Sequence, residues 1–145
     1  MPKLFLATLF FFLVNDPAWL NNLDKAKELA KQENKLILVN FSGSDWCIPC
    51  IRMHEQVFAS GDFVKYASDN LILVNIDFPR KNKNQLSKDQ QKINDALAER
   101  YNPTGIFPYT VLLNKEGNKI KVWDGFYNKG VQNFIDEMKE ASRNK

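Results

Sequence analysis

Cysteine and histidine are scarce in this 145-residue sequence, which contains two cysteines and one histidine. A small secreted domain held together by disulfides would carry more cysteines, spread along the chain. Both cysteines here lie in the segment Cys47-Ile48-Pro49-Cys50, and a bridge that closes so small a ring adds little stability. A zinc site would need two further ligands, and His54 lies too near Cys50 to complete a usual one. We therefore expect no metal and interpret the pair as a redox-active disulfide that needs no other cofactor.

The sequence also has little excess of one sign of charge over the other. Twenty basic and 17 acidic residues leave a net charge of +3, which is too small to indicate a nucleic-acid partner. The 44% apolar and 26% charged residues are typical of a globular protein, and the length suits a single domain with one core. The sequence contains no internal repeat and no low-complexity tract. We expect a monomer.

No apolar run is long enough to span a bilayer. The longest, Leu4 to Val14, is interrupted only by Thr8 and would rise about 16 Å as a helix, about half of the hydrocarbon core. With Lys3 before it, the run has the length of the apolar part of a signal peptide, although no small-x-small cleavage triplet follows. We predict an export signal or hydrophobic anchor at residues 1–15 and a domain at residues 16–145, located in the periplasm or elsewhere outside the cytoplasm. A terminal segment docked on the domain is the alternative.

Hydrophobic periodicity predicts alternating helices and strands. Asp16-Pro17 has the pattern of an N-cap with Pro at N1, and helical spacing continues to about Asn34. Apolar runs predict strands at 36–41, 71–78 and 109–113, and a turn at 115–118 leads to a further strand at 119–123. A helix follows the turn at residues 42–45, which supplies its N-cap, and a capping box at Ser87 introduces another, with Ile93, Leu97 and Tyr101 on one face.

An amphipathic helix with Val131, Phe134, Ile135 and Met138 completes the predicted order: helix, strand, helix, strand, helix, strand, strand, helix. Strand–helix alternation gives parallel pairing, and the last two strands form an antiparallel hairpin. The fold class is therefore α/β, with a central mixed sheet flanked by helices on both faces.

The position of the cysteines predicts their chemistry. Cys47 falls in the first turn of its helix, where free N–H groups and the positive end of the helix dipole favour an anion. Such a position can lower a thiol pKa from about 8.5 to roughly 3.5–7.5, and the thiolate is the attacking species. Cys50 lies one turn further on, where it can attack the mixed disulfide that Cys47 forms. Pro49 fits there because first-turn N–H groups need no partner within the helix.

Two segments resemble the signatures of the thioredoxin family. Val39-Asn40-Phe41 followed by Trp46 to Cys50 is similar to the active-site segment, and Gly105 to Thr110 is similar to the loop whose proline is cis and faces the cysteines. The resemblance covers about residues 17–145 and implies the thioredoxin fold, with a cis bond before Pro108. It also implies an enzyme that exchanges disulfides with disulfide-containing or unfolded proteins and is recycled by a redox partner protein. Asp45-Trp46-Cys47 and the insertion at Arg80 resemble exported bacterial members.

Aromatic residues beside the reactive sulfur suit unfolded substrates. We expect a peptide-binding groove formed by Trp46, Ile48, Pro49, Phe107, Pro108 and Tyr109. A proline before the second cysteine is similar to reductive members of the family and favours a reductase. Two alternatives remain open: a non-catalytic module that binds client proteins through the Pro108 groove, and a redox sensor whose cysteine pair switches an interaction.

Two positions depart from the family. Thioredoxins carry a buried Asp and a Lys that serve proton transfer at the inner cysteine, whereas the matching residues here are Asn40 and Leu73, which cannot titrate. On an ideal helix Cys47, Cys50, His54 and Phe58 share one face, so a neutral His54 could take the proton of Cys50. Glu55 is a second candidate for this proton, and a solvated surface residue is its alternative interpretation. A core histidine bonded to a carbonyl is the alternative interpretation of His54.

A group of basic residues has no assigned role in these predictions. Either they recognise an acidic partner or they form a solvated loop and helix surface. The group consists of Arg80, Lys81, Lys83, Lys88 and Lys92.

Overall fold

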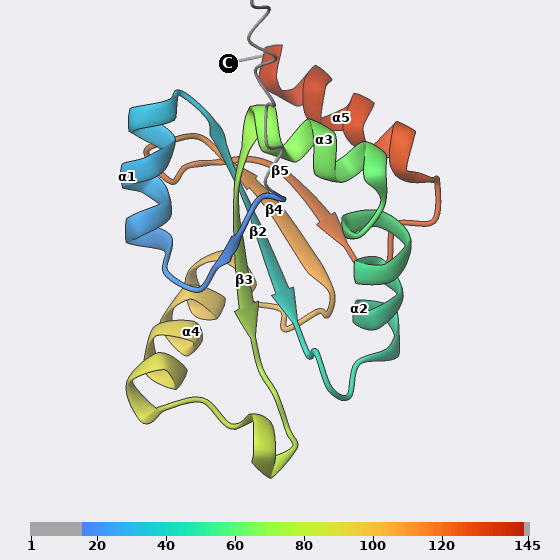
Figure 1. Cartoon of the computed structure of the whole chain (residues 1–145). Coiled ribbons are helices and arrows are strands. Elements are labelled where there is room, and N and C mark those ends of the chain that lie inside the picture. Colours follow the sequence, from blue (N-terminus) through green and yellow to red (C-terminus); the bar gives the residue numbers. More distant parts are fainter. Residues whose placement is uncertain (1–15, 144–145) are drawn as a thin grey trace, which may run out of the picture.

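A computed structural model describes residues 16–143 and shows a five-stranded mixed sheet between two layers of helices (Figure 1). The helices are α1 (Leu23–Glu33), α2 (Ile48–Met53), the π-helical η1 (His54–Phe58), α3 (Gly61–Asn70), the 3-10 turn η2 (Asn82–Asn84), α4 (Lys88–Tyr101) and α5 (Val131–Arg143). The strands are β1 (Trp19–Leu20), β2 (Leu36–Ser42), β3 (Leu71–Asp77), β4 (Tyr109–Leu113) and β5 (Lys119–Asp124).

The strand order is β1-β3-β2-β4-β5. β1, β3 and β2 run parallel, and β4 pairs antiparallel with both β2 and β5. α1 and α4 cover one face, while α2, η1, α3 and α5 cover the other. This arrangement confirms the predicted α/β class and the thioredoxin fold.

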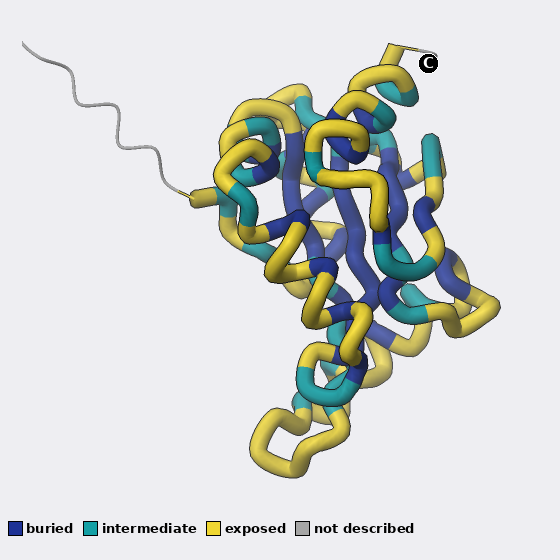
Figure 2. The backbone as a smooth tube through the Cα atoms, turned by 90° about the vertical axis from the view of Figure 1, so that its right-hand side faces the viewer, coloured by how far each residue is buried: buried dark blue, intermediate teal, exposed yellow. Residues whose placement is uncertain are grey.

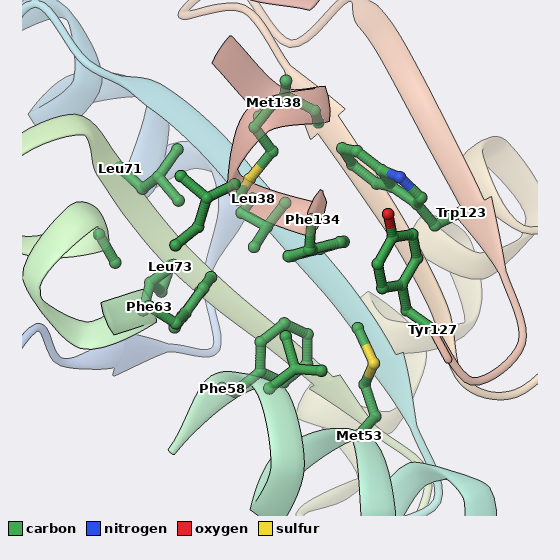
Figure 3. Packing of buried hydrophobic residues seen from close by; sticks show 14 residues of the cluster. Leu38, Met53, Phe58, Phe63, Leu71, Leu73, Trp123, Tyr127, Phe134 and Met138 are labelled. Atoms are coloured by element: carbon green, nitrogen blue, oxygen red, sulfur yellow. The ribbon is translucent and has the colours of Figure 1, made fainter. Parts of the chain in front are cut away.

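The α5 side of the sheet holds an aromatic core (Figure 3). Phe134 of α5 is fully buried and packs against Trp123 and Tyr127, with ring centroids 4.7 and 5.1 Å away. Phe58 of η1 meets the same ring at 6.2 Å. Because η1 directly continues α2, these contacts fix the helix that carries the cysteine pair to the sheet.

The predicted start of the first helix is wrong. α1 begins at Leu23, and its N-cap is Asn22, whose side chain accepts the N–H of Lys25 at 2.9 Å. The preceding residues Trp19 and Leu20 form the short edge strand β1 on β3 instead. Strand pairing with a distant segment overrides the local helical spacing here. Asp16 and Pro17 lie before β1 and do not start a helix.

Two helical predictions also need correction. The single helix expected after the cysteine pair is divided, because η1 widens its last turn and Ser60 caps a separate helix, α3. In α4, Ser87 is the N-cap as predicted, but Ile93 is exposed and Asn94 is buried. Asn94 is buried because its amide donates to the Asp77 carbonyl at 2.9 Å, a tertiary contact that periodicity alone does not reveal.

No helix within residues 16–143 has the length and apolar character needed to cross a membrane. The predicted export or anchor segment at residues 1–15 lies outside the described residues.

Candidate active site

The cysteine pair lies just past the end of the central strand β2. Cys47 and Cys50 form a disulfide, with Cα atoms 5.2 Å apart. Cys47 is itself the N-cap of α2, and its Sγ accepts the N–H of Cys50 at 3.3 Å. The predicted cap from the turn at residues 42–45 is therefore wrong, since the sulfur takes that place. This position brings the Cys47 sulfur against the free N–H groups of the helix start, where negative charge is favoured.

Access to the pair is restricted. Cys47 and Cys50 are only 5% and 3% exposed, whereas Ile48 between them is 69% exposed and Pro49 is also exposed. A partner can therefore contact the Ile48-Pro49 surface while it approaches the disulfide.

The loop of Pro108 flanks the end of β2. The Phe107–Pro108 bond is cis, as predicted, and Pro108 is buried. Tyr109 pairs with Phe41 in the antiparallel register. Pro108, one residue before Tyr109, therefore lies beside the segment that runs from the end of β2 to Cys47. The Phe107 ring meets Trp46 edge-on, with centroids 5.8 Å apart.

Trp46 and Phe107 thus lie together beside the cysteine pair. Tyr109 is half-buried and packs edge-on against Phe41 at 6.4 Å, in the core on the α1 side of the sheet.

Four neighbours fix the Trp46 indole. Its Nε1–H donates to the Phe78 carbonyl at 2.7 Å, and the Arg80 guanidinium stacks on the ring at 3.5 Å from the centroid. A Cβ at Gly43 would overlap the indole, so only glycine permits this approach. Together with Phe107, these contacts make Trp46 a preformed wall beside Cys47.

Two carboxylates bind the loop after β3 to the loop before Cys47. Asp77 accepts the N–H and the hydroxyl of Ser44 at 2.9 and 2.5 Å. Asp45 accepts the backbone N–H groups of Arg80 and Lys81 and the side-chain amide of Asn84, at 2.9 to 3.0 Å. The bond from the Arg80 N–H, followed by that from Asn84, holds the pKa of Asp45 below its ordinary value. The two loops therefore form one hydrogen-bonded unit.

A cleft of about 350 Å³ opens beside Cys50 on the β3 side of the pair. Its apolar walls come from Trp19, Ile51 and Phe58, and its polar lining includes Asn40, Asn75, His54 and Glu55. Cys47 does not contribute to this lining. The two cysteines thus face different surroundings.

An uncharged polar row crosses three strands beneath the pair. Thr110 Oγ1 donates to Asn40 Oδ1 at 3.3 Å, and Asn40 Nδ2 donates to Asn75 Oδ1 at 3.2 Å. No member of the row can take up a proton at neutral pH. Leu73 packs with Leu38 in the aromatic core, so it also supplies no titrating group.

The structure brings His54 to Cys50. The backbone N–H of His54 donates to the Cys50 carbonyl, so the histidine follows the cysteine by one helical turn, and both residues line the cleft with Phe58. His54 is exposed, which rules out the alternative of a buried core histidine. Glu55 lines the same cleft.

Sequence reasoning missed Asn75 and Thr110 as partners of Asn40, and Asp77 as an anchor of the loop. A signal for Asn75 was present, because Leu-Val-Asn occurs both at residues 38–40 and at residues 73–75. Register pairs Asn40 with Asn75. A polar residue at the same place in two apolar strands indicates such a pair.

Within residues 16–143 no cluster of histidine, cysteine and carboxylate side chains could hold a metal ion.

Comparison with known proteins gives consistent matches. Residues 23–141 match the family described as a thioredoxin-like domain. The disulfide bond reductase DsbH of Chlamydia pneumoniae is 36% identical over 117 residues, which cover 81% of this chain and 68% of that protein.

Solved structures extend the match. A structure described as DsbH oxidoreductase aligns with a TM-score of 0.80 at 30% identity and covers 99% of this chain and 96% of its own. A thioredoxin from Thermus thermophilus aligns with a TM-score of 0.64 at 17% identity, covering 88% of each chain, and shows the shared fold.

Proposed function

The chain belongs to the thioredoxin-like family and is a thiol–disulfide oxidoreductase, and from this premise we propose that it reduces protein disulfides. Cys47 is the attacking cysteine and Cys50 the resolving cysteine. The reducing direction is supported by the relative named a disulfide bond reductase and by Pro49 before the second cysteine.

The reaction starts from the reduced pair. The Cys47 thiolate attacks one sulfur of a substrate disulfide, which breaks the substrate S–S bond and releases the other sulfur as a thiolate. Cys50 then loses its proton and attacks the Cys47 sulfur. The mixed disulfide breaks, the second substrate sulfur leaves, and Cys47–Cys50 forms. Two electrons pass to the substrate, and the disulfide in the structure is the oxidised end of this cycle.

Cys47 is suited to the first step by its place at the helix start. The backbone N–H of Cys50 lies 3.3 Å from the Cys47 sulfur and stabilises a thiolate on Cys47 after reduction. Trp46, Ile48, Pro49 and Phe107 form the surface that holds the substrate chain beside this sulfur, and the buried Pro108 and half-buried Tyr109 support that surface from below.

The second step requires a proton acceptor for Cys50. The Thr110–Asn40–Asn75 row cannot serve, so the proton leaves through the cleft. His54 is the base we assign, since it lines the cleft one turn from Cys50. Glu55 is the second group within the same cleft.

Substrates on this account are disulfide-containing or unfolded proteins, and a partner protein with a reduced dithiol returns the pair to its reduced state. We place the enzyme outside the cytoplasm on the strength of the apolar run at residues 4–14. A reporter enzyme that folds only outside the cytoplasm, fused after residue 16, tests this location. Activity of a fusion that lacks residues 1–15 would contradict it.

The observation that carries the proposal is the disulfide at the start of a helix beside a cis-proline loop. The test is turnover of a disulfide-bonded protein with dithiothreitol as electron donor, together with the reduction potential of the pair. We expect turnover that Cys47→Ser and Cys50→Ser abolish, and a potential nearer to about −270 mV than to about −120 mV. A binding module or a redox sensor would show no turnover, and a potential near −120 mV would make the protein an oxidant.

A further inference from the structure

A basic loop projects from the fold close to the cysteine pair. We call residues Arg80 to Lys88 the basic arm; it contains four cations and no carboxylate. It follows β3 and ends at the first residue of α4, extends beyond the end of the sheet, and is exposed from Arg80 to Gln85 (Figures 1 and 2).

The arm is fixed to the active-site loop. Asp45 accepts hydrogen bonds from the backbone N–H groups of Arg80 and Lys81 and from the side-chain amide of Asn84. Within the loop, the Gln85 side-chain amide donates to the Pro79 and Lys81 carbonyls at 3.3 and 3.4 Å. The anchoring bonds at Arg80 and Lys81 use backbone N–H groups. The Lys81 side chain therefore stays available to a partner, that of Arg80 stacks on Trp46, and the arm is placed before any partner arrives.

Most of the positive charge of the arm is left without a salt bridge in the described part of the chain. Among residues 16–143 none of the ion pairs within 4.0 Å involves a cation of the arm. Asp45, the carboxylate that touches the arm, offsets one of its four positive charges, because it accepts hydrogen bonds from Arg80 and Lys81 and interacts with the Lys81 charge. Arg80 stacks on Trp46, so one of these charges lies against the residue that precedes Cys47.

We propose that the basic arm selects protein substrates whose disulfide is flanked by aspartate and glutamate residues. This inference rests on the proposed reductase function and names its preferred substrate class. Trp46 and Ile48 offer apolar contact beside the sulfur, and the arm adds a fixed positive field at one end of that surface. A field of this kind acts mainly on the association rate, and salt weakens it.

The experiment uses the reduced protein and three peptides with the same disulfide ring and acidic, neutral or basic flanks. Second-order rate constants are measured in single turnover at about 20 mM and about 0.5 M salt. We expect the acidic peptide to react about tenfold faster than the neutral one at low salt, and the ratio to approach one at high salt. The neutral peptide reports the reductase function separately.

Variants locate the effect. Lys81→Gln, Lys83→Gln and Lys88→Gln together should bring the acidic-to-neutral ratio close to one. The matched control removes three cations that do not belong to the arm, by Lys25→Gln and Lys31→Gln in α1 and Lys65→Gln in α3, and should keep the parent ratio.

Several results would overturn the inference. A parent ratio near one at low salt, or an equal loss in the control, shows that the arm does not select acidic flanks. If the arm variant reacts more slowly with all three peptides by the same factor, the arm affects the reactivity of Cys47 rather than the choice of substrate. Binding of the parent to phosphatidylglycerol vesicles that the arm variant loses, at an unchanged ratio, assigns it to a lipid surface. Failure to reduce any peptide overturns the reductase function, and this inference with it.

Discussion

The two cysteines lie three residues apart but have different surroundings. On the Cys47 side, the basic arm, Trp46 and the cis-proline loop form a wall that is fixed by hydrogen bonds and stacking. On the Cys50 side there is a cleft of about 350 Å³ with ionisable residues at its edge and an uncharged polar row beneath it. The first side is suited to hold a substrate chain, and the second to carry a proton.

On the proposed mechanism, the two sides serve different steps of the exchange. The first attack needs a stabilised thiolate and a surface that recognises a substrate, and the start of α2 provides both. The second step needs a thiol to lose its proton in a nearly buried place, since Cys50 is 3% exposed. Because Asn40 and Asn75 beneath it cannot take up a proton, we propose that Cys50 transfers its proton through the cleft.

The largest effect should come from the cleft side. His54→Ala should slow resolution of the mixed disulfide by about 10- to 100-fold, at the low end of the usual range for a general base because a thiol ionises partly without help. The first attack by Cys47 should change less than about twofold. Stopped-flow single-turnover kinetics between pH 5 and 9 separates the steps. Glu55→Gln is the matched control, and a larger loss there than in His54→Ala would transfer the role to Glu55.

On the substrate side, Trp46→Ala should lower the rate of the first attack about tenfold and leave resolution unchanged. The reason is that the substrate loses one aromatic contact surface, and a tenfold slower rate corresponds to about 1.4 kcal/mol of lost binding free energy. Tyr66→Ala, on α3 away from the cysteine pair, serves as control for a general loss of packing. Slower resolution in Trp46→Ala would show that the two sides are not independent.

Asn40→Asp tests whether the polar row excludes proton transfer. The new carboxylate is desolvated and should cost about 1–3 kcal/mol of stability at pH 7. Burial raises the pKa of such a carboxyl above its unfolded value, so this cost should disappear as the pH falls through the raised folded pKa. In the His54→Ala background the same change should restore resolution several-fold.

Asn94→Asp, buried near Asp77, is the control for Asn40→Asp and should destabilise the fold without rescue. Urea unfolding at pH 5 and pH 8 measures the stabilities. Equal resolution with and without the new carboxylate would mean that water alone carries the proton.

The smallest effect should come from the anchor of the arm. Hydrogen bonds hold the pKa of Asp45 below its unfolded value, so its contribution to stability is present above about pH 4 and is lost as the pH falls through the lowered folded pKa. Asp45→Asn should lower the melting temperature slightly at pH 7 and not at all at pH 2. A difference that persists at pH 2 would assign the effect to lost shape rather than to charge.

Local patterns predicted most of the fold. The strands at Leu36 and Tyr109 were identified because uninterrupted apolar runs of that length suit a buried sheet. The strand at Trp19 could not be found, since two residues carry no periodicity and their pairing with β3 is decided by distant residues. The widened turn of η1 likewise leaves no local signal at His54 to Phe58.

The site was predicted where a motif encodes it and missed where only tertiary structure does. Cys47, Cys50 and the cis bond before Pro108 follow from two short signatures. The link from Asp45 to Arg80 joins residues 35 positions apart and depends on how two loops meet at the end of the sheet. Helical spacing placed His54 beside Cys50, but its exposure depends on the cleft that Trp19 and Asn75 help to form.

The most direct test of the two-sided account is the identity of the trapped mixed disulfide. Cys50→Ser and Cys47→Ser are each reduced, incubated with a disulfide-bonded protein substrate and mapped by mass spectrometry. The account predicts a covalent complex through Cys47 in the first variant and none in the second. A complex formed through Cys50 in the Cys47→Ser variant, at a rate equal to that of Cys47, would contradict it.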